Sequence, residues 1–537
     1  MKNFSDFLNM TVYQVYLRSF QDSNGDGVGD LQGVLSRLDH LQELGVNAVW
    51  LCPCYKSPNH DNGYDVADYL AIQPEYGSFA DWEKLRDGLK ARNMALIMDL
   101  VVNHTSDEHP WFLASRSSRD NPYRDYYIWA KKPPNHWQSC FGGSAWKYDP
   151  QTQEYYLHSF SVHQPDLNWE NPRVRAEIRA VVDFWVERGV DGFRCDVIDF
   201  IAKDFAENKM HGGPFLRAYL KELFHRPHLK GLFTVGESQA NKESVSLLCG
   251  EDSQALTTVF QFDHVRLGQS KKDKFKPVPD TLDDFKKQLV KWQKIAKELQ
   301  FPYALFTDNH DQAPLLSRLG NDRELRYECA TMLAACVYLL KGIPFIFQGQ
   351  EYGFASSTYT DIQAFQDVES VQYYEKYKGR KTEQELLSAL NFGSRDNPRR
   401  PMAWTDSEQA SHGFSTGTPW LGVHSRAEEI NLEKDKAAEK SVFAFYQKLL
   451  AFRQKTACVR QGEFRDLTKD RTGCFFYERQ GGKDSVFVLC NFEKEQTLPL
   501  PQALQKGYRL VLHNYADAEP FSERFRPYEV KVYEKHR

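Results

Sequence analysis

The sequence predicts an α/β protein whose centre is a closed barrel of parallel strands, each followed by a helix. Eight short apolar runs alternate along the chain with patterns of helical periodicity, and eight such units favour a (β/α)8 barrel over an open sheet. Residues 104–170 and 349–440 interrupt this alternation with irregular sequence. After residue 456 the pattern changes to short alternating strands, which predict a C-terminal antiparallel β-sandwich.

The barrel strands are predicted from short runs that are rich in β-branched and aromatic side chains. In chain order these runs are residues 11–17, 48–52, 95–102, 192–198, 233–237, 257–262, 303–307 and 344–348. The helices are predicted where apolar residues recur every three or four positions, as at Leu31, Leu35 and Leu38. Their ranges are 31–44, 78–92, 172–188, 214–224, about 241–249, 281–298, 326–340 and 441–456.

The same patterns divide the chain into domains. At ~150 residues per domain, a chain of 537 residues corresponds to ~3 to 4 domains. The barrel is predicted to take residues 1–103 and 171–457. A subdomain inserted after the third strand takes residues 104–170, which are rich in Trp, Tyr, Pro, Asn and Gly, and the sandwich takes residues 458–537.

The composition is that of a folded protein with nearly balanced charge. Lys and Arg number 68 and Asp and Glu 73, for a net charge of −5, which argues against nucleic acid as a partner because that needs a basic face. The hydrophobic fraction of 41% and the charged fraction of 26% exclude disorder as the dominant state. The aromatic fraction of 14% fits either a large core or a ligand with flat apolar faces, such as a sugar ring.

The sequence shows no pattern typical of a signal peptide or a membrane span, and its cysteines are scattered. These features predict a cytoplasmic protein that does not bind a membrane. The N-terminal MKNFSDFLNM carries Asp6 where a signal peptide would be apolar. The longest apolar run, residues 330–340, is shorter than the ~20 residues of a membrane span. Ten cysteines without a CxxC pair predict reduced thiols rather than a disulfide framework.

Polar side chains gather at the C-terminal ends of four predicted strands, where a parallel barrel carries its chemistry. A single carboxylate there is an ordinary helix cap, but converging charges are costly unless they are used. The set consists of Asp99, Asn103 and His104 after the third strand, Arg194 and Asp196 on the fourth, Glu237 on the fifth, and Asp308, His310 and Asp311 after the seventh.

This combination of groups fits glycoside hydrolysis. The carboxylates, an arginine and two histidines occur without a CxxC or HExxH metal motif. In a retaining mechanism one carboxylate is the nucleophile and a second carboxyl is the acid/base, ~5–5.5 Å away. Arg194 precedes Asp196 by two residues, so both side chains face the same side of the strand and the arginine can keep that carboxylate ionised.

Several segments resemble the α-amylase superfamily of glycoside hydrolases, and specifically its oligo-1,6-glucosidase branch. The resemblance covers nearly the whole chain and implies the barrel, the insertion and the sandwich predicted above. The segments are DLVVNH (99–104), GFRCDVI (192–198), VGE (235–237) and NHD (309–311), in the family's order, with QPDLN (164–168), DNGYDVADY (61–69) and SRDNPRRPMAW (394–404).

The resemblance implies roles for the matching residues. Asp196 is the implied nucleophile and Glu237 the implied general acid/base. Asp311 is the implied third carboxylate, which grips the sugar hydroxyls and distorts the ring. His104 and His310 are implied to hydrogen-bond the same sugar.

The resemblance also implies a pocket that is closed at one end. Asp61 and Arg395 would close around the non-reducing end of the substrate, with Tyr64 as a stacking platform and Arg194 beside the nucleophile. A closed pocket implies exo action, with one terminal glucose released at a time. Val197 follows the implied nucleophile; family members that cut α-1,6 bonds commonly have valine there, whereas those that prefer α-1,4 bonds often carry another residue.

The expected activity is therefore that of an exo-acting retaining α-glucosidase on short α-1,6-linked glucosides, performed by a monomer that binds a small oligosaccharide and no organic cofactor. Two alternatives in the same family are an α-1,4-glucosidase (maltase) and a trehalose-6-phosphate hydrolase, which would need a cationic cluster for the phosphate. A third is a non-catalytic barrel like the transporter heavy chains, which carry a membrane span and have lost catalytic carboxylates. This chain keeps Asp196, Glu237 and Asp311.

Residues 22–30, DSNGDGVGD, place oxygen donors at alternate positions, as the first part of an EF-hand loop does. Gly27 stands at the sixth position, but Gly33 replaces the bidentate Glu of the twelfth. The pattern predicts a structural divalent-cation site or, alternatively, an Asp/Gly turn without an ion. The resemblance implies calcium, with magnesium as the alternative, bound by Asp22, Asn24, Asp26, the backbone carbonyl of Val28 and Asp30.

Overall fold

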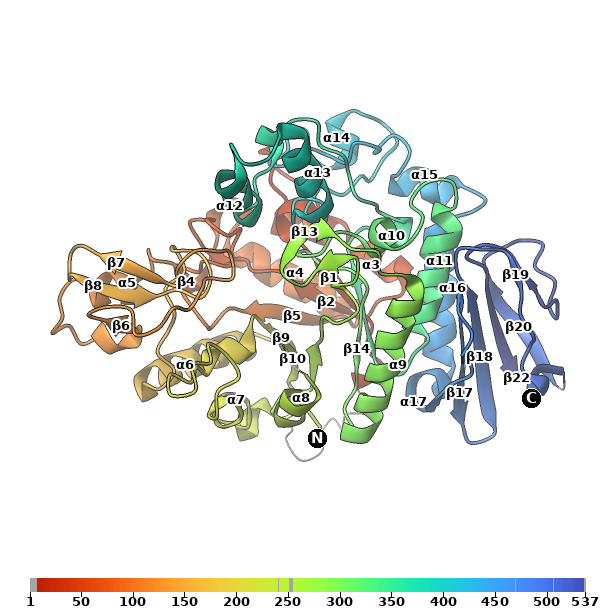
Figure 1. The fold of residues 1–537 in the computed structure, drawn as a ribbon, viewed down its shortest axis with the longest axis horizontal. Coiled ribbons are helices and arrows are strands. Elements are labelled where there is room, and N and C mark those ends of the chain that lie inside the picture. Colours follow the sequence, from red (N-terminus) through yellow and green to blue (C-terminus); the bar gives the residue numbers. More distant parts are fainter. Residues whose placement is uncertain (1–6, 240, 251–254, 469, 506, 536–537) are drawn as a thin grey trace.

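The computed structural model describes residues 7–239, 241–250, 255–468, 470–505 and 507–535. Its centre is a barrel of eight parallel strands, which confirms the predicted fold class (Figure 1). Strands that are neighbours in chain order pair with one another, except the sixth and the seventh, and the last pairs with the first. The strands are β1 (Val12–Val15), β2 (Ala48–Leu51), β5 (Ala95–Leu100), β9 (Gly192–Cys195), β10 (Phe233–Glu237), β11 (Thr258–Phe260), β14 (Ala304–Leu305) and β15 (Ile343–Phe347).

The barrel is nearly closed. Within the described residues, β11 and β14 lie in contact but share no hydrogen-bonded ladder. The runs 95–102 and 192–198 predict longer strands than β5 and β9, which end at Leu100 and Cys195. The chain turns out of the sheet after Cys195 because Val197 takes a left-handed conformation, with φ 34° and ψ 45°. The residues that follow these strands therefore lie at the rim of the barrel.

Helices cover the outside of the barrel close to their predicted ranges. Ser78 and Thr281 each form a capping box, which satisfies the first backbone amides of their helices. The predicted helix 31–44 is wrong in one respect: it is two helices, α2 (Leu31–Ser36) and α3 (Leu38–Leu44), because Arg37 leaves the helical conformation. The other barrel helices are α4 (Phe79–Ala91), α6 (Pro172–Glu187), α7 (Leu216–Phe224), α8 (Lys242–Leu248), α9 (Leu282–Leu299), α11 (Arg326–Tyr338) and α16 (Val442–Lys455).

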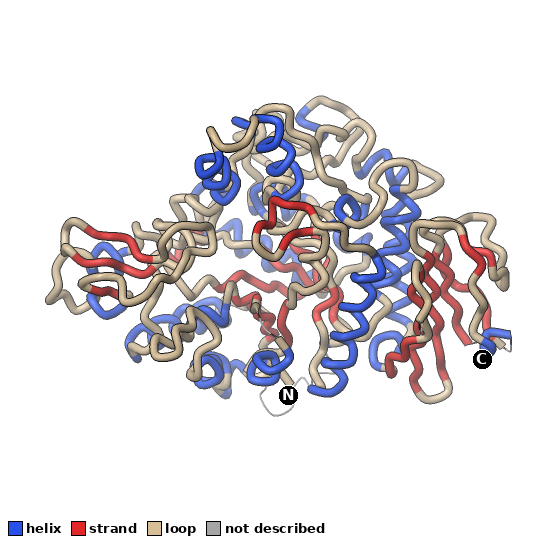
Figure 2. Tube along the Cα trace, in the orientation of Figure 1, coloured by secondary structure: helices blue, strands red, loops and turns tan. Residues whose placement is uncertain are grey.

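The segment 349–440, at the top of Figures 1 and 2, is more regular than predicted. It contains α12 (Val368–Tyr377) and α13 (Glu383–Gly393) beside shorter helices. These helices pack with Phe275 of β13 (Asp273–Pro277) in a small apolar cluster of their own. The capping box of α13, made by Thr382 and Glu385, is a start signal that the sequence analysis did not use.

The inserted segment 104–170 lies at one end of the molecule in Figure 1, away from the C-terminal sheet. It contains β6 (Trp129–Ala130), β7 (Trp146–Asp149) and β8 (Glu154–Leu157), which form an antiparallel sheet in the order β6-β8-β7. An isolated bridge between His104 and Asp166 joins the beginning of the segment to its end. This bridge returns the chain to the barrel close to the point where it left.

The C-terminal segment forms a five-stranded antiparallel sheet covered on one face by a two-stranded ribbon. Phe476 and Leu489 of the sheet pack against Leu498, which follows the ribbon's first strand, and against Phe525 of its second. The sheet strands, in spatial order, are β16 (Glu463–Asp466), β17 (Cys474–Gly481), β18 (Asp484–Asn491), β22 (Val530–Lys535) and β20 (Tyr508–His513), and the ribbon is β19 (Gln496–Thr497) with β21 (Arg524–Phe525).

The other face of this sheet covers α11, which is the longest apolar run of the sequence. The Tyr477 hydroxyl donates to the backbone carbonyls of Ala335 and Cys336 in α11. Nearly every residue of α11 is buried, as expected for a helix that is apolar all round. In the described part of the chain, no helix is both long and apolar enough to cross a membrane. All ten cysteines are free thiols, and nine are buried.

Candidate active site

A cavity of about 190 Å³ opens at the C-terminal ends of the barrel strands. Nine of the ten sequence-predicted catalytic, binding and specificity residues line it, and the tenth, Arg194, lies buried beside it. Further lining comes from the inserted segment and from the segment after β15. The predicted residues that line the cavity are Asp61, Tyr64, His104, Asp196, Val197, Glu237, His310, Asp311 and Arg395.

Arg194 is the charge centre at the base of the cavity. Its Nη1 donates to Asp99 Oδ1 at 2.6 Å and to Asp196 Oδ1 at 2.7 Å, and its Nη2 donates to Glu237 Oε2 at 2.5 Å. The pairing of β5 with β9 places Asp99 opposite Arg194. One guanidinium therefore faces three carboxyl groups, so the cluster is negative unless two of them hold protons.

The two carboxyl groups implied as nucleophile and acid share this electrostatic setting. Burial raises the pKa of Glu237; Arg194 opposes the shift, and the charge of Asp311 adds to it. Burial also raises the pKa of Asp196, again opposed by Arg194 and increased by Glu237. The two carboxyl groups act on each other's charge, so they titrate as a pair.

Asp311 has the opposite electrostatic environment. Burial would raise its pKa, but the facing His310, Arg399 and Arg395 hold the pKa well below its usual range. Arg399 Nη2 donates to Asp311 Oδ1 at 2.7 Å, and Arg395 Nη1 lies 3.5 Å from the same oxygen. Asp311 is therefore an ionised acceptor beside two carboxyl groups whose pKa values are raised.

The two histidines of the cavity are neutral. Burial lowers the pKa of His310 to about 3 and lowers that of His104. Gln14 Nε2 lies 2.8 Å from His310 Nδ1 and Asp311 Oδ2 lies 3.1 Å from its Nε2, which assigns the proton to Nε2. The ring of His310 is parallel to that of Tyr64, with centroids 5.3 Å apart.

A buried ion pair lines the cavity. Arg395 Nη2 donates to Asp61 Oδ1 at 3.0 Å, and Arg395 Nε donates to Asp367 Oδ1 at 2.7 Å. Gln164 Nε2 donates to Asp61 Oδ2 at 3.2 Å. The pair thus joins the loop before β4 (Asp68–Ile72) to the segment after β15.

Four contributors to the site received no individual role in the sequence analysis, although it placed Asp99 among the polar residues at the barrel mouth. Asp99 accepts hydrogen bonds from Trp50 Nε1 and from the Tyr64 hydroxyl in addition to Arg194. The others are Gln164, Asp367 and Arg399, which act on Asp61, Arg395 and Asp311. Asp99, Gln164 and Arg399 lie inside segments that the sequence analysis quoted. Only Asp367, at the start of α12, lacks such a signal.

Val197 holds an unusual backbone conformation next to Asp196. Its φ of 34° is strained for a β-branched residue. Its amide nitrogen donates to Glu237 Oε2 at 3.2 Å. This hydrogen bond therefore links Val197, the residue after Asp196, to the carboxyl group of Glu237 on the neighbouring strand.

The loop 22–30 is built around Asp22. Asp22 Oδ1 accepts the amide of Gly25 at 2.8 Å, and Oδ2 accepts the amide of Gly27 at 2.9 Å. Burial would raise the pKa of Asp22, but hydrogen bonds from Ser415 and these amides lower it. Gly27 has φ 92°, and an added Cβ would lie 1.9 Å from the Thr418 carbonyl, so this turn requires glycine.

The predicted donors of this loop are all oxygens, which is the donor chemistry that calcium prefers. In the part of the chain that the structure describes, the loop's three carboxylates do not meet within 4.8 Å of one another. Asp30 also accepts the amides of Ser23 and Gly33. An ion would therefore have to draw the outer donors of the loop toward Asp22.

Known proteins resemble this chain in both sequence and fold. Residues 14–462 match the family model of the α-amylase catalytic domain. The oligo-1,6-glucosidase of Halalkalibacterium halodurans is 43% identical over 97% of both chains, and the trehalose-6-phosphate hydrolase of Bacillus subtilis is 40% identical over 97% of both. The crystal structure of the trehalose-6-phosphate hydrolase of Bacillus licheniformis superposes with a TM-score of 0.92, at 36% identity, over 99% of this chain and 100% of that one.

Proposed function

Since the chain belongs to the α-amylase family of glycoside hydrolases, we propose that it is an exo-acting retaining α-glucosidase that releases terminal glucose from short α-1,6-linked glucosides. The observation that carries the proposal is the buried Asp61–Arg395 ion pair, which lines the cavity together with the carboxyl groups and would close it around the end of a sugar chain. The volume of the cavity, about 190 Å³, is below the ~300–1,000 Å³ of pockets for drug-sized ligands. A cavity of this size suits one terminal sugar ring.

In the first step of the proposed reaction, an Asp196 oxygen attacks the anomeric carbon while Glu237 donates its proton to the glycosidic oxygen. The glycosidic bond breaks, the leaving sugar departs as an alcohol, and glucose remains as an ester on Asp196. In the second step Glu237, now a carboxylate, takes a proton from water as the water oxygen attacks the same carbon. The ester bond breaks, Asp196 is released, and the product keeps the α configuration.

The neighbouring groups set the protonation of both carboxyls. Arg194, hydrogen-bonded to Asp196 and to Glu237, favours the ionised form of each. Burial raises the pKa of both, so the assignment of Asp196 as nucleophile and Glu237 as acid rests on their positions in the family's motifs. Asp311 is an ionised acceptor for sugar hydroxyls, and neutral His104 and His310 line the cavity beside it, with their ring N–H groups donated to the Tyr64 carbonyl and to Asp311.

The substrate preference rests on Val197 and on the named relatives. Val197 lines the cavity next to Asp196, where its side chain is placed to contact the group beyond the bond to be cut. The relatives that are named oligo-1,6-glucosidases support an α-1,6 linkage. An α-1,4 preference remains the nearest alternative within the same mechanism.

Trehalose-6-phosphate hydrolysis is a second candidate, and Arg266 favours it. Arg266 donates to Gln239 Oε1, and Gln239 lines the cavity, so a guanidinium stands near the leaving-group side. Against it, the cations that line the described cavity, Lys274 and Arg395, are both paired with carboxylates, Lys274 with Glu369. The paired cations favour a neutral substrate.

A substrate panel tests the proposed function directly. With isomaltose, maltose and trehalose 6-phosphate at equal concentrations, isomaltose is expected to give the highest kcat/KM and α-glucose as the first product. NMR spectroscopy of the early reaction measures both the rate and the anomer. If trehalose 6-phosphate is the best substrate and Arg266→Gln reduces its kcat/KM alone, the second candidate is correct. β-Glucose as the first product would contradict the retaining mechanism.

We also propose that the loop 22–30 binds a structural calcium ion, with magnesium as the alternative. The side chains of Asp22, Asn24, Asp26 and Asp30 and the Val28 carbonyl would hold it. The support is the all-oxygen donor set and the Asp22 carboxylate, whose pKa is lowered by hydrogen bonds from Ser415 and backbone amides against the effect of burial. An ion here would fasten the loop to the segment 415–418 that it already contacts, and it would take no part in the reaction.

Removal of calcium is expected to lower the melting temperature, because an ion that binds only the folded state stabilises it by mass action. At ~100 times the Kd this stabilisation is ~2.7 kcal/mol. Differential scanning calorimetry with EGTA, followed by added calcium, measures the loss and its recovery. Asp26→Asn should shrink the calcium response, whereas Asp39→Asn, an exposed carboxylate that pairs with Arg92, should not. An identical melting curve with and without calcium would show that the loop binds no stabilising ion.

We propose that the protein is cytoplasmic and monomeric. Nine of its ten thiols are buried and none is paired, which suits a reducing compartment. Sedimentation of the purified protein measures the oligomeric state.

A further inference from the structure

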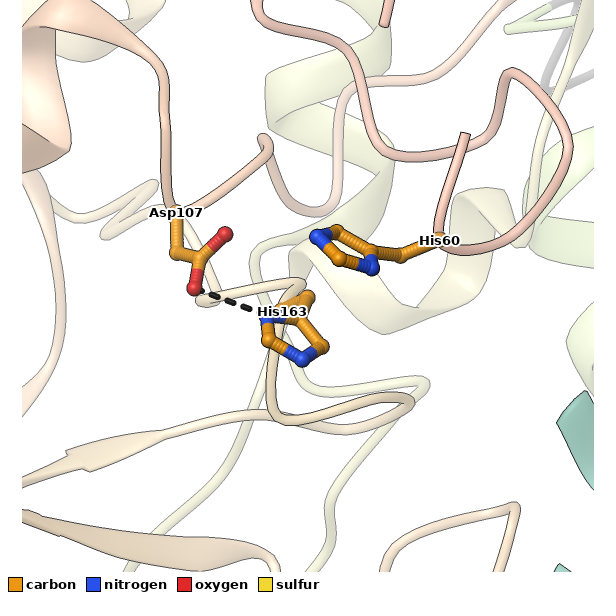
Figure 3. A group of neighbouring side chains, drawn as sticks. All are labelled: His60, Asp107 and His163. Carbon is orange, nitrogen blue, oxygen red and sulfur yellow. Dashed lines mark hydrogen bonds and ion pairs between the residues drawn. The ribbon is translucent and has the colours of Figure 1, made fainter. Parts of the chain in front are cut away.

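Two histidines and an aspartate meet at the rim of the barrel, outside the cavity described above (Figure 3). His60 comes from the loop between β3 (Tyr55–Lys56) and β4, and Asp107 and His163 come from the two ends of the inserted segment. One ligand atom from each residue lies within 4.8 Å of the others. Among the described His, Cys, Asp and Glu side chains, this is the one group of three or more that converges so closely.

The spacing of these groups suits a shared ion. His163 Nδ1 lies 2.9 Å from Asp107 Oδ2. Two ligands that each lie ~2.0–2.2 Å from one metal ion are ~3 Å apart when they occupy adjacent coordination positions. The imidazole rings of His60 and His163 are stacked, with centroids 3.8 Å apart and planes inclined by 13°. Because the rings are stacked, the His60 ring would have to rotate about its side-chain bonds to aim a nitrogen at the same point, and its ligand atom already lies within 4.8 Å of the other two.

The backbone holds the three side chains in place before any ion binds. The Asp107 amide donates to the His163 carbonyl at 3.0 Å, which ties the two ends of the inserted segment together. The His60 amide donates to Asp65 Oδ2 at 2.8 Å, and the Ser106 amide donates to the Val66 carbonyl at 2.8 Å. The loops that carry the three groups are therefore fixed to one another by hydrogen bonds, which lowers the cost of ordering a binding site.

We propose that His60, Asp107 and His163 bind a divalent transition-metal cation of the zinc type. Two imidazole nitrogens and one carboxylate oxygen are a donor set that zinc and its neighbours accept, whereas calcium and magnesium prefer oxygen donors alone. Three protein ligands leave a coordination position for water. His163 and Asp107 expose 41% and 23% of their side chains, so the ion can reach the site from solvent.

The position of this site connects it to the cavity. His60 immediately precedes Asp61, and His163 immediately precedes Gln164. Gln164 Nε2 donates to Asp61 Oδ2 at 3.2 Å, and Asp61 pairs with Arg395 in the cavity wall. A metal ion on His60 and His163 therefore clamps the two loops whose next residues form the cavity wall, and we expect it to lower KM while leaving kcat unchanged.

The proposal is tested by titrating zinc into metal-free protein in an isothermal titration calorimeter. One ion per chain is expected, and His60→Ala and His163→Ala should each weaken zinc binding by at least about 10-fold, since even the partners of metal ligands contribute 10- to 100-fold. His136→Ala is the matched control, because His136 is an exposed histidine of the same inserted segment. It should bind zinc as the unchanged protein does.

Cobalt absorption separates this site from the exposed thiol of Cys140. Cobalt held by nitrogen and oxygen gives weak visible bands, whereas a thiolate ligand adds an intense charge-transfer band. Wild-type affinity in both His60→Ala and His163→Ala, or a thiolate band that disappears in Cys140→Ser, would overturn the site. A KM that does not respond to zinc would overturn the clamp, and the calorimetric result does not depend on which sugar the enzyme cleaves.

Discussion

Glu237→Gln is expected to lower kcat by ~100-fold or more, the scale of general acid–base catalysis, while the protein keeps its fold. Glutamine has nearly the shape of glutamate, and its carbonyl oxygen can still accept from Arg194 and from the Val197 amide. It cannot protonate the glycosidic oxygen. Steady-state kinetics on isomaltose measure the loss. With α-glucosyl fluoride, whose leaving group needs no proton, the first step should be largely retained and appear as a burst, whereas the second step still lacks its base.

The pH dependence of stability distinguishes this variant from one that merely unfolds. Burial raises the pKa of Glu237, against the effect of Arg194. The folded state therefore keeps a proton that the unfolded chain loses near pH ~4.3, and stability falls as pH rises from that value through the folded pKa. Glutamine removes this loss, so the variant should melt at the same temperature as the unchanged protein or higher at pH 7.

Glu207→Gln is the matched control, because Glu207 is an exposed glutamate in the segment between β9 and β10. It should change neither turnover nor melting. Near-normal turnover of Glu237→Gln on isomaltose would remove Glu237 from the proposed role, whatever the melting curves show.

Arg194→Met is expected to destabilise the protein by ~3–5 kcal/mol, the cost of removing one partner from a buried charge cluster. The Arg194 side chain is 3% exposed and faces Asp99, Asp196 and Glu237. Without it these carboxyl groups keep their burial but lose their counter-charge, so the folded state holds its protons to still higher pH. The loss of stability should therefore be largest at neutral pH and smallest in acid, where the carboxyls are protonated in both states.

Urea denaturation at several pH values measures this effect. Arg173→Met is the control, since Arg173 is an exposed arginine whose polar contact is the Pro122 carbonyl, and a surface change of this kind stays within ~0.5 kcal/mol. A midpoint for Arg194→Met that matches the control at pH 7 would show that the cluster does not depend on its cation. Activity should be lost in Arg194→Met even where it is folded, because Asp196 is no longer held ionised.

The sequence predicted the barrel well because its evidence is local. Eight apolar runs and the helices between them are visible as periodicity, and the ladder of eight parallel strands follows their order. The same reasoning was wrong where a helix is interrupted by the backbone conformation of one residue, because periodicity does not record backbone angles. The run 31–44 has one unbroken apolar stripe, yet the helix is interrupted at Arg37. Likewise, α12 and α13 pack on a separate cluster around Phe275, so barrel periodicity did not reveal them.

The candidate site was predictable to the extent that its residues follow strand ends. The rule that parallel strands carry chemistry at their C-terminal ends brought Asp196, Glu237 and Asp311 together before any coordinates. The partners of these residues were not assigned, because a contact such as Arg399 with Asp311 joins segments 88 residues apart. No periodic pattern records a contact of that kind.

The sequence by itself determined the order of the barrel elements and which carboxyl groups stand at its mouth, because both follow from short-range patterns in the chain. Only the tertiary structure decided how those groups are charged. It placed one guanidinium, Arg194, against three carboxyls and surrounded Asp311 with cations, and a pKa depends on burial and distance rather than on residue type. It also brought His60 to His163, residues that the chain separates by more than a hundred positions.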